Sequence, residues 1–220
     1  MIKIFSNNFL LFICFISISC SEYRKILKED GYEKKLESAL KYYENEEYFK
    51  ASTLLKDIKP LVKGSEESET VDFYFAYSLY NLKQYDLSAK YFKGFMELFS
   101  RSEKVIEAEY LYSISLYKES PNSNLDQSST IEAISAIQNF INKYPYSEDS
   151  KNANSIIDEL QIKLETKNFD NAKQYYKTRN YKSAIIALEN FENDFPDSSL
   201  NEEGSYLKVL SQYLISINSF

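Results

Sequence analysis

The chain has 220 residues, a formal net charge of −7 at neutral pH, no histidine and no tryptophan. Without histidine it lacks the commonest general base, the histidine-assisted nucleophiles and every histidine-containing metal site. We therefore expect no catalytic residue, no metal and no cofactor. The acidic balance without a basic run argues against nucleic acid as a partner. With only 4 glycines and 4 prolines, long helices are favoured over turn-rich β folds.

The N-terminus has the features of a secretory signal. Lys3 precedes an apolar run over residues 9–18, which is too short to span a bilayer. Ser-Ile-Ser stands directly before Cys20, and polar chain follows at once. This ending resembles a lipoprotein signal peptide, in which residues 1–19 are removed and Cys20 carries the membrane anchor. Residues 20–30 would then form a lipid-anchored linker. An ordinary cleaved secretory signal is the alternative.

Four later segments share the spacing of one helical stripe. Each has a small residue, a bulky apolar residue four positions on and another three further on. A turn that ends in serine follows each stripe, and this serine is placed to accept from the free N–H groups of the next helix. The four sets, each given with its serine, are Ala51, Leu55, Ile58 and Ser65; Ser88, Phe92, Phe95 and Ser102; Ala133, Ile137, Phe140 and Ser147; and Ala184, Leu188, Phe191 and Ser198.

A further small residue lies twelve positions before three of these markers, at Ala39, Ala76 and Ala172. The resulting helix–turn–helix pattern resembles the tetratricopeptide repeat, without its usual tryptophan and glycine. The sequence thus predicts an all-α fold, a tetratricopeptide-like solenoid of about nine helices over residues 31–220. We expect repeats at about residues 32–63, 68–100, 103–145 and 148–196, and a partial fifth repeat at 199–220.

The repeats are unequal in length. The markers lie 37, 45 and 51 residues apart. The second interval has eight extra residues in the Ser- and Asn-rich stretch 119–128, which predicts a loop. The third has fourteen extra residues, about four whole helical turns, in a stretch without glycine or proline. Whole turns lengthen a helix without rotating its apolar face, so we expect one long helix from about Glu148 to Lys177.

The middle of the chain resembles the BamD family of outer-membrane assembly lipoproteins, in the form found in Bacteroidetes-type bacteria. The resemblance covers residues 23–220. It rests on Cys20, on the inserted loop with Leu125-Asp-Gln127, and on four short segments. These are Phe-Ile-Asn-Lys-Tyr-Pro at 140–145, Leu-Glu-Thr-Lys at 164–167, Asn-Ala-Lys-Gln-Tyr-Tyr-Lys-Thr at 171–178 and Phe-Pro-Asp-Ser at 195–198. The family has five repeats, and this chain stops inside the fifth.

The resemblance implies a scaffold without enzymatic activity in the outer-membrane β-barrel assembly machinery, the BAM complex. The C-terminal half would hold a BamA-like barrel subunit, other BAM lipoproteins would be neighbours, and the N-terminal repeats would receive unfolded outer-membrane proteins. The lipid anchor would hold the chain on the periplasmic face of the outer membrane.

The first helices of the first two repeats are rich in tyrosine. Outer-membrane substrates end in an aromatic-rich strand, and an apolar trough with a few hydroxyl and amide groups suits such a segment. Alternatively, these side chains form repeat core, because solenoid helices bury two faces. The candidate peptide-binding residues are Leu36, Leu40, Tyr43, Phe73, Tyr77, Tyr80 and Asn81.

Other interpretations stay open at this point. The chain could be another periplasmic tetratricopeptide scaffold or a glycan-binding lipoprotein of nutrient uptake, although the latter proteins are longer and stack sugars on tryptophan. A wall hydrolase would need a glutamate in an apolar pocket, and no glutamate is isolated by the pattern. Asp126 and Gln127 either contact a partner or cap the following helix, where Ser129 and Glu132 have capping-box spacing.

Overall fold

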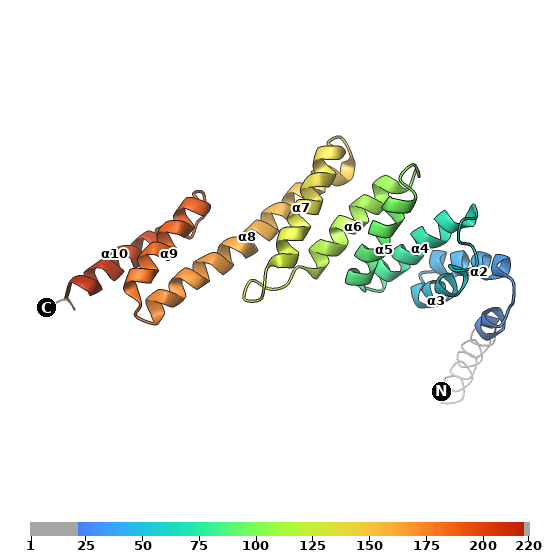
Figure 1. Cartoon of the computed structure of the whole chain (residues 1–220), viewed down its shortest axis with the longest axis horizontal. Helices are drawn as coiled ribbons and strands as arrows, with labels where there is room; N and C mark the ends of the chain where they lie inside the picture. The colour runs from blue at the N-terminus through green and yellow to red at the C-terminus, as the bar shows by residue number, and fades with distance from the viewer. Residues whose placement is uncertain (1–21, 218–220) are drawn as a thin grey trace, which may run out of the picture. The chain divides into compact units, whose positions relative to one another are not determined.

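The computed structural model describes residues 22–217, in which the regular structure is entirely helical. Nine helices, α2 to α10, follow a short helical segment at residues 22–27 (Figure 1). Consecutive helices pack against one another from α2 to α5 and from α7 to α10, in a tetratricopeptide-like arrangement. The predicted all-α fold is confirmed. Cys20 and the signal segment lie outside the described residues. The helices are α2 (Tyr32–Glu44), α3 (Tyr48–Ile58), α4 (Glu67–Asn81), α5 (Tyr85–Leu98), α6 (Val105–Glu119), α7 (Ser128–Lys143), α8 (Glu148–Lys177), α9 (Tyr181–Asp194) and α10 (Asn201–Ile217).

The helices form two compact units, which divide within α6 between Ser115 and Leu116. The first unit has a core between α2, α3 and α4 and a second between α4, α5 and α6. The second unit has one core between α7 and the first half of α8 and another between the end of α8, α9 and α10. Each core thus joins helices of more than one hairpin, as expected where a single repeat cannot bury its own apolar face.

The predicted stripe residues form these cores. Every marker is at most 2% exposed, from Ala51 in α3 to Phe191 in α9. The small residues of the preceding helices are equally buried, with Ala39 and Ala76 at 0% and Ala172 at 2%. Burial of a large apolar side chain stabilises a fold by about 1.5–3 kcal/mol, so these stripes supply much of the favourable free energy of folding.

The predicted long helix is confirmed as α8, which has 30 residues and a length of about 45 Å at 1.5 Å per residue. Ser147 is its N-cap, and the serine oxygen accepts from Ser150 N at 3.1 Å. Its first half buries Ile157 and Leu160 against α7, and its second half buries Phe169 in the next core. One uninterrupted helix therefore contributes to both cores of its unit.

Of the four serines that follow the stripes, Ser147 caps the next helix as predicted. The hydroxyl of Ser102 accepts from Lys104 N at 3.0 Å and that of Ser198 from Leu200 N at 3.3 Å, but these two amides precede the first residues of α6 and α10, so neither serine caps its helix. The prediction was also wrong for Ser65, whose hydroxyl donates to the carboxylate of Glu67, while Glu66 occupies the N-cap position of α4. The predicted loop is present at residues 120–127, between α6 and α7.

Three of the turns between paired helices share one backbone conformation. Glu46, Lys83 and Arg179 have φ angles of 61°, 60° and 63°, in the left-handed region. In the Lys83 turn, the next amide N–H donates to Leu79 O at 3.0 Å, and the other two turns have the equivalent bond. This is the C-terminal helix cap in which glycine is preferred, because a Cβ atom costs about 1–2 kcal/mol there. The turn is kept although the glycine usual in the repeat is absent.

We therefore expect Lys83→Gly to raise the free energy of unfolding by about 0.5–1 kcal/mol, since relief of the strain exceeds the extra flexibility of glycine in the unfolded chain. Lys83→Ala keeps the Cβ atom and should change the stability little. Urea unfolding of both variants measures the difference, and a glycine variant no more stable than the alanine variant would contradict the explanation.

Candidate functional site

The tyrosines of α2, α4 and the start of α5 form a continuous row in the first unit, which we call the tyrosine ladder. The ring centroid of Tyr43 lies 4.8 Å from that of Tyr74 and 5.6 Å from that of Tyr77. Tyr77 lies 6.2 Å from Tyr80, and Tyr80 lies 5.6 Å from Tyr85. Most of these contacts are edge-on, the arrangement that aromatic rings prefer. All five residues are half-buried, so each keeps part of its side chain accessible to solvent.

Phe73 departs from the expectation that it lines this surface. It is only 2% exposed and lies beneath the ladder, 5.8 Å from the ring of Tyr77 and 6.0 Å from that of Phe92. Its side chain therefore supports the tyrosines from the core and does not reach a ligand. Phe73 thus belongs to the core, as the alternative interpretation has it, and the tyrosines lie at the edge of this core.

The remaining candidate residues lie around the ladder. Leu36 packs partly buried against the first core, and Leu40 is half-buried one turn further along α2. Asn81 donates its side-chain N–H to Tyr77 O at 3.1 Å, within its own helix. Sequence reasoning missed Tyr48, which packs 5.5 Å from Tyr43. The sequence could have indicated Tyr48, because pairs of tyrosines five positions apart recur at three helix–helix turns, at residues 43 and 48, 80 and 85, and 176 and 181.

Three tyrosines of the ladder have a raised hydroxyl pKa. Burial raises the pKa of Tyr43, of Tyr77 and of Tyr80. For Tyr77, the carboxylate of Glu107 in α6 raises the pKa further. At neutral pH these phenols are therefore hydrogen-bond donors beside apolar ring surface, a combination that suits backbone carbonyl groups and aromatic side chains of a peptide.

We expect part of the tyrosine absorbance change to occur above pH 10 in the folded protein. Tyrosine in the unfolded chain titrates near pH 10, so above that pH the folded state binds more protons than the unfolded state. The free energy of unfolding should therefore decrease as the pH rises above 10. A tyrosinate absorbance titration combined with alkaline unfolding measures both effects. Tyr77→Phe should remove part of the late absorbance change. An unchanged late phase would contradict the assignment.

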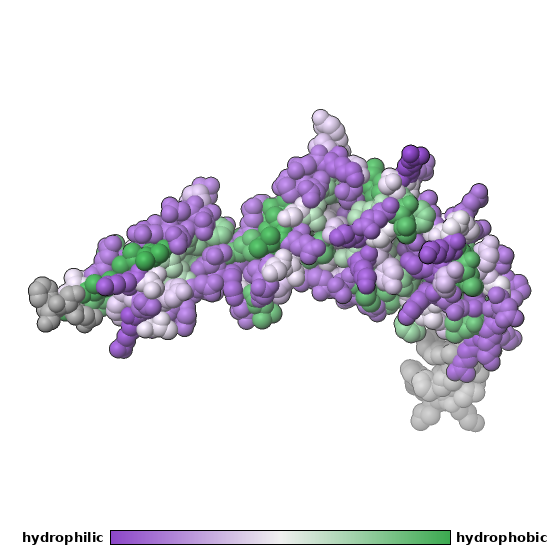
Figure 2. Space-filling view, viewed as in Figure 1, coloured by the Kyte–Doolittle hydropathy of each residue, from purple (hydrophilic) through white to green (hydrophobic). Residues whose placement is uncertain are grey.

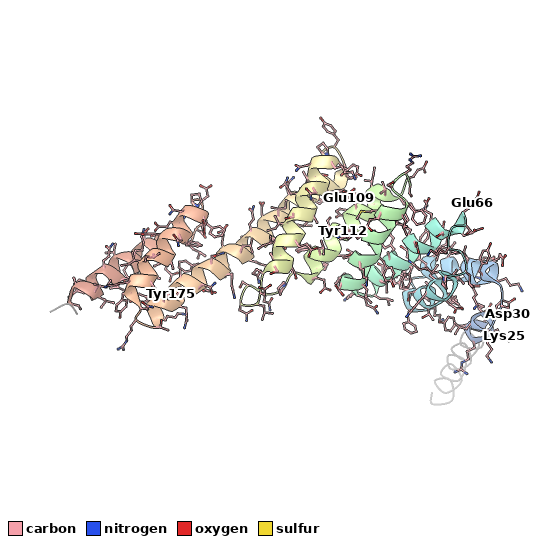
Figure 3. All side chains as sticks on the ribbon, viewed as in Figure 1. Lys25, Asp30, Glu66, Glu109, Tyr112 and Tyr175 are labelled. Carbon is pink, nitrogen blue, oxygen red and sulfur yellow. The ribbon has the colours of Figure 1, made fainter. Side chains whose placement is uncertain are left out.

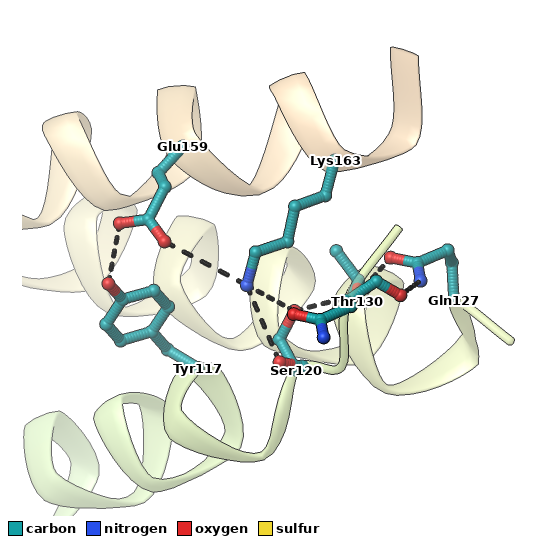
Figure 4. A network of polar contacts seen from close by, with 7 residues as sticks. Tyr117, Ser120, Gln127, Thr130, Glu159 and Lys163 are labelled. Atoms are coloured by element: carbon teal, nitrogen blue, oxygen red, sulfur yellow. Dashed lines mark hydrogen bonds and ion pairs between the residues drawn. The ribbon is translucent and has the colours of Figure 1, made fainter. Parts of the chain in front are cut away.

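In the second unit, a polar network fastens the loop at residues 120–127 to α8 (Figure 4). Tyr117 donates to the carboxylate of Glu159 at 2.6 Å, which raises the pKa of Tyr117 to about 12. Lys163 lies 3.9 Å from Glu159 and donates to Ser120 Oγ at 3.2 Å. One turn further along α8, Lys167 donates to Asn124 O at 3.0 Å. Two lysines of α8 thus hold the loop by its oxygen atoms.

The three residues of the Leu-Asp-Gln segment differ in burial, with Gln127 buried and the other two exposed. Gln127 is 8% exposed, and its amide donates to Asn122 O at 2.8 Å and accepts from Thr130 at 2.8 Å, so its role is structural. At the start of α7, Asp126 accepts from Ser128 N at 3.0 Å, and hydrogen bonds to the side chain and then the backbone of Ser128 lower the pKa of its carboxyl group. The expected Ser129–Glu132 capping box is wrong, because α7 already begins at Ser128. Leu125 is 54% exposed.

A second exposed surface of this unit lies on α10. Apolar side chains are exposed along the helix, as the space-filling view shows (Figure 2). Tyr206, Val209, Tyr213 and Ile217 are all at least half exposed. The opposite side of α10 is buried through Leu207, which packs into the core with α8 and α9. The helix therefore has one apolar side in the core and another facing solvent.

Within residues 22–217, acidic and cysteine side chains form no cluster suited to a metal ion. In the same part of the chain, every helix is too short or too polar to cross a bilayer.

The comparison with known families supplies the deciding observation. The profile of the YfiO family, described as an outer membrane lipoprotein, matches residues 29–204. The chain belongs to the YfiO family. The matched residues run from just before α2 to the first turn of α10, so the tyrosine ladder lies within the family region, whereas the exposed apolar residues of α10 lie beyond it. A search of curated proteins gives no match. Family membership supports an association with the outer membrane.

Proposed function

We propose that this YfiO-family chain is a BamD-type subunit of the outer-membrane β-barrel assembly machinery. It would act as a scaffold on which a BamA-like barrel subunit, other lipoproteins of the complex and unfolded barrel proteins meet. The family match over residues 29–204 carries the proposal. The chemistry of the described residues is consistent with it, because their exposed features are apolar and aromatic surfaces suited to protein partners.

Attachment to the membrane is proposed through an acylated Cys20. The support is the signal-like N-terminus and the description of the family as lipoproteins. Acylation would hold the first repeat on the periplasmic face of the outer membrane, because two or three acyl chains anchor a protein stably where one is marginal.

The two units are proposed to bind different partners. In the second unit, the exposed side of α10 with Val209 and Tyr213 offers an apolar docking surface for the barrel subunit. In the first unit, the tyrosine ladder with Leu36, Leu40 and Asn81 offers rings and hydroxyl donors for the aromatic end of an unfolded barrel protein.

Photo-crosslinking in membranes tests the scaffold role. A crosslinking amino acid at Val209, which is 66% exposed, should capture the barrel subunit, whereas one at Tyr80 should capture unfolded outer-membrane proteins. Tyr146, at 96% exposed on the turn before α8, is the control position and should capture neither preferentially. If Val209 captures no barrel-assembly subunit, the proposal is wrong.

Peptide binding tests the ladder separately. Tyr77→Ala combined with Tyr80→Ala should weaken binding of a C-terminal outer-membrane-protein peptide by about 10–100-fold, since truncation of a buried aromatic contact commonly costs 1 kcal/mol or more. Isothermal titration measures the affinity, and circular dichroism confirms that the variant is folded.

Two controls sharpen the peptide experiment. Tyr206→Ala removes an exposed tyrosine of α10 and should leave the affinity unchanged. Tyr77→Phe keeps the ring and removes only the hydroxyl group, so it should weaken peptide binding less than Tyr77→Ala does. Equal affinities of the wild type and the double variant would exclude the ladder as the peptide site and leave the scaffold role intact.

A further inference from the structure

The short helical segment before α2 is amphipathic. Residues 22–27 are helical, and Lys28 N donates to Lys25 O at 3.1 Å to complete the last turn. At 100° per residue, Tyr23, Ile26 and Leu27 lie on one side of this segment. Arg24, Lys25 and Lys28 lie on the opposite side, and all three are exposed. The segment therefore has an apolar face and a basic face; Lys25 is labelled in Figure 3.

The apolar face is packed onto the first repeat. Tyr23, Ile26 and Leu27 contact the core formed by α2, α3 and α4. The ring of Tyr23 lies 5.7 Å from that of Tyr42 in edge-on contact, and the ammonium group of Lys50 lies 5.9 Å from the same ring. Most of the expected linker is thus part of the folded unit, and its orientation relative to α2 is set by side-chain packing.

The acidic side chains of the segment lie on a different side from the basic face. Glu22 and Glu29 line an open groove of about 710 Å³ against α2, together with Lys34 and Lys41, and Glu29 pairs with Lys34 at 2.8 Å. None of the three residues of the basic face lines this groove. The basic face therefore carries three positive charges in a chain whose formal net charge is −7.

The position of the basic face in the chain limits its distance from the proposed anchor. Glu22, the first described residue, is two residues after Cys20, so at full extension it lies within about 7 Å of the acylated residue. The Debye length is about 8 Å at physiological salt, so charges this close to a membrane surface are only partly screened. Clusters of Lys and Arg beside a membrane anchor attract anionic lipid.

We propose that Arg24, Lys25 and Lys28 bind the anionic headgroups of the membrane to which Cys20 is anchored. The proposal rests on the acylation of Cys20 in the proposed function. Since the apolar face of the same segment is packed on the first core, this contact holds the first repeat against the membrane surface. The partner is a phospholipid surface with negative charge, and the acidic remainder of the chain is repelled by it.

The contact has a predictable strength. Each Lys or Arg beside an anionic surface favours association by about fivefold. Three such residues together favour the membrane-apposed state of the first repeat by up to about a hundredfold. High salt should weaken the contact, whereas the acyl anchor itself should be insensitive to salt.

The experiment measures the distance from the first repeat to the membrane in the acylated full-length protein. Cys14 lies in the predicted signal segment and Cys20 carries the acyl group, so Glu44→Cys at the exposed end of α2 provides one thiol for a fluorescent dye. Energy transfer from this dye to acceptor lipids is compared in vesicles with phosphatidylglycerol and in vesicles of only phosphatidylethanolamine and phosphatidylcholine.

The test variant combines Arg24→Gln, Lys25→Gln and Lys28→Gln. It should lower the ratio of apposed to detached first repeats by up to about a hundredfold in the anionic vesicles and leave the neutral vesicles unaffected. The control variant combines Lys177→Gln, Arg179→Gln and Lys182→Gln, which removes the same charge from exposed positions of the second unit. It should leave energy transfer unchanged.

Two results would overturn the proposal and are distinguishable. Equal energy transfer from the test variant and the wild type in anionic vesicles, with both chains still anchored, would exclude the basic face as a lipid contact and leave the proposed function standing. A wild-type chain that remains with neither kind of vesicle would overturn the proposed anchoring, and the lipid contact with it.

Discussion

The fold depends on close approach between helices at positions where both side chains are small. Ala39 and Ala51 are fully buried in the first hairpin, and Ala172 and Ala184 occupy the equivalent positions near the end of α8 and the start of α9. A larger side chain would push the axes apart and open gaps along the whole apolar stripe, because interiors are close-packed. The bulky stripe residues can be exchanged for one another more easily than these contacts can be widened.

In the second hairpin a serine takes the place of alanine and adds a polar contact. Ser88 Oγ donates to Ala76 O at 3.2 Å across the helix pair, and Ser115 Oγ in α6 donates to Ser88 Oγ at 3.2 Å. The chain of bonds satisfies buried hydroxyl groups that would otherwise cost free energy, so the small residue here joins three helices. Close packing at the same site then allows the phenylalanine-rich core under the tyrosine ladder.

The sequence was most informative where one physical rule decides the outcome. Helical spacing predicted the buried stripes, and arithmetic on the markers predicted α8, because an insertion of whole turns keeps its face. It was least informative where two rules compete. Phe73 and Tyr77 share the same helix pattern, and only the packing of α4 against α5 decides which one reaches solvent. The capping of α7 could not be read from Ser129 and Glu132, because the fastened loop advances the helix start to Ser128.

The continuity of α8 has a consequence for how the second unit unfolds. Repeat proteins often lose structure one repeat at a time, because each repeat interacts only with its neighbours. Here Leu160 and Phe169, one in each core of the unit, belong to the same 30-residue helix. Fraying of α9 and α10 would expose the apolar side of a helix that the first core still holds in place. The second unit should therefore open as a larger cooperative block than its repeat number implies, and slow amide exchange should extend along the whole of α8.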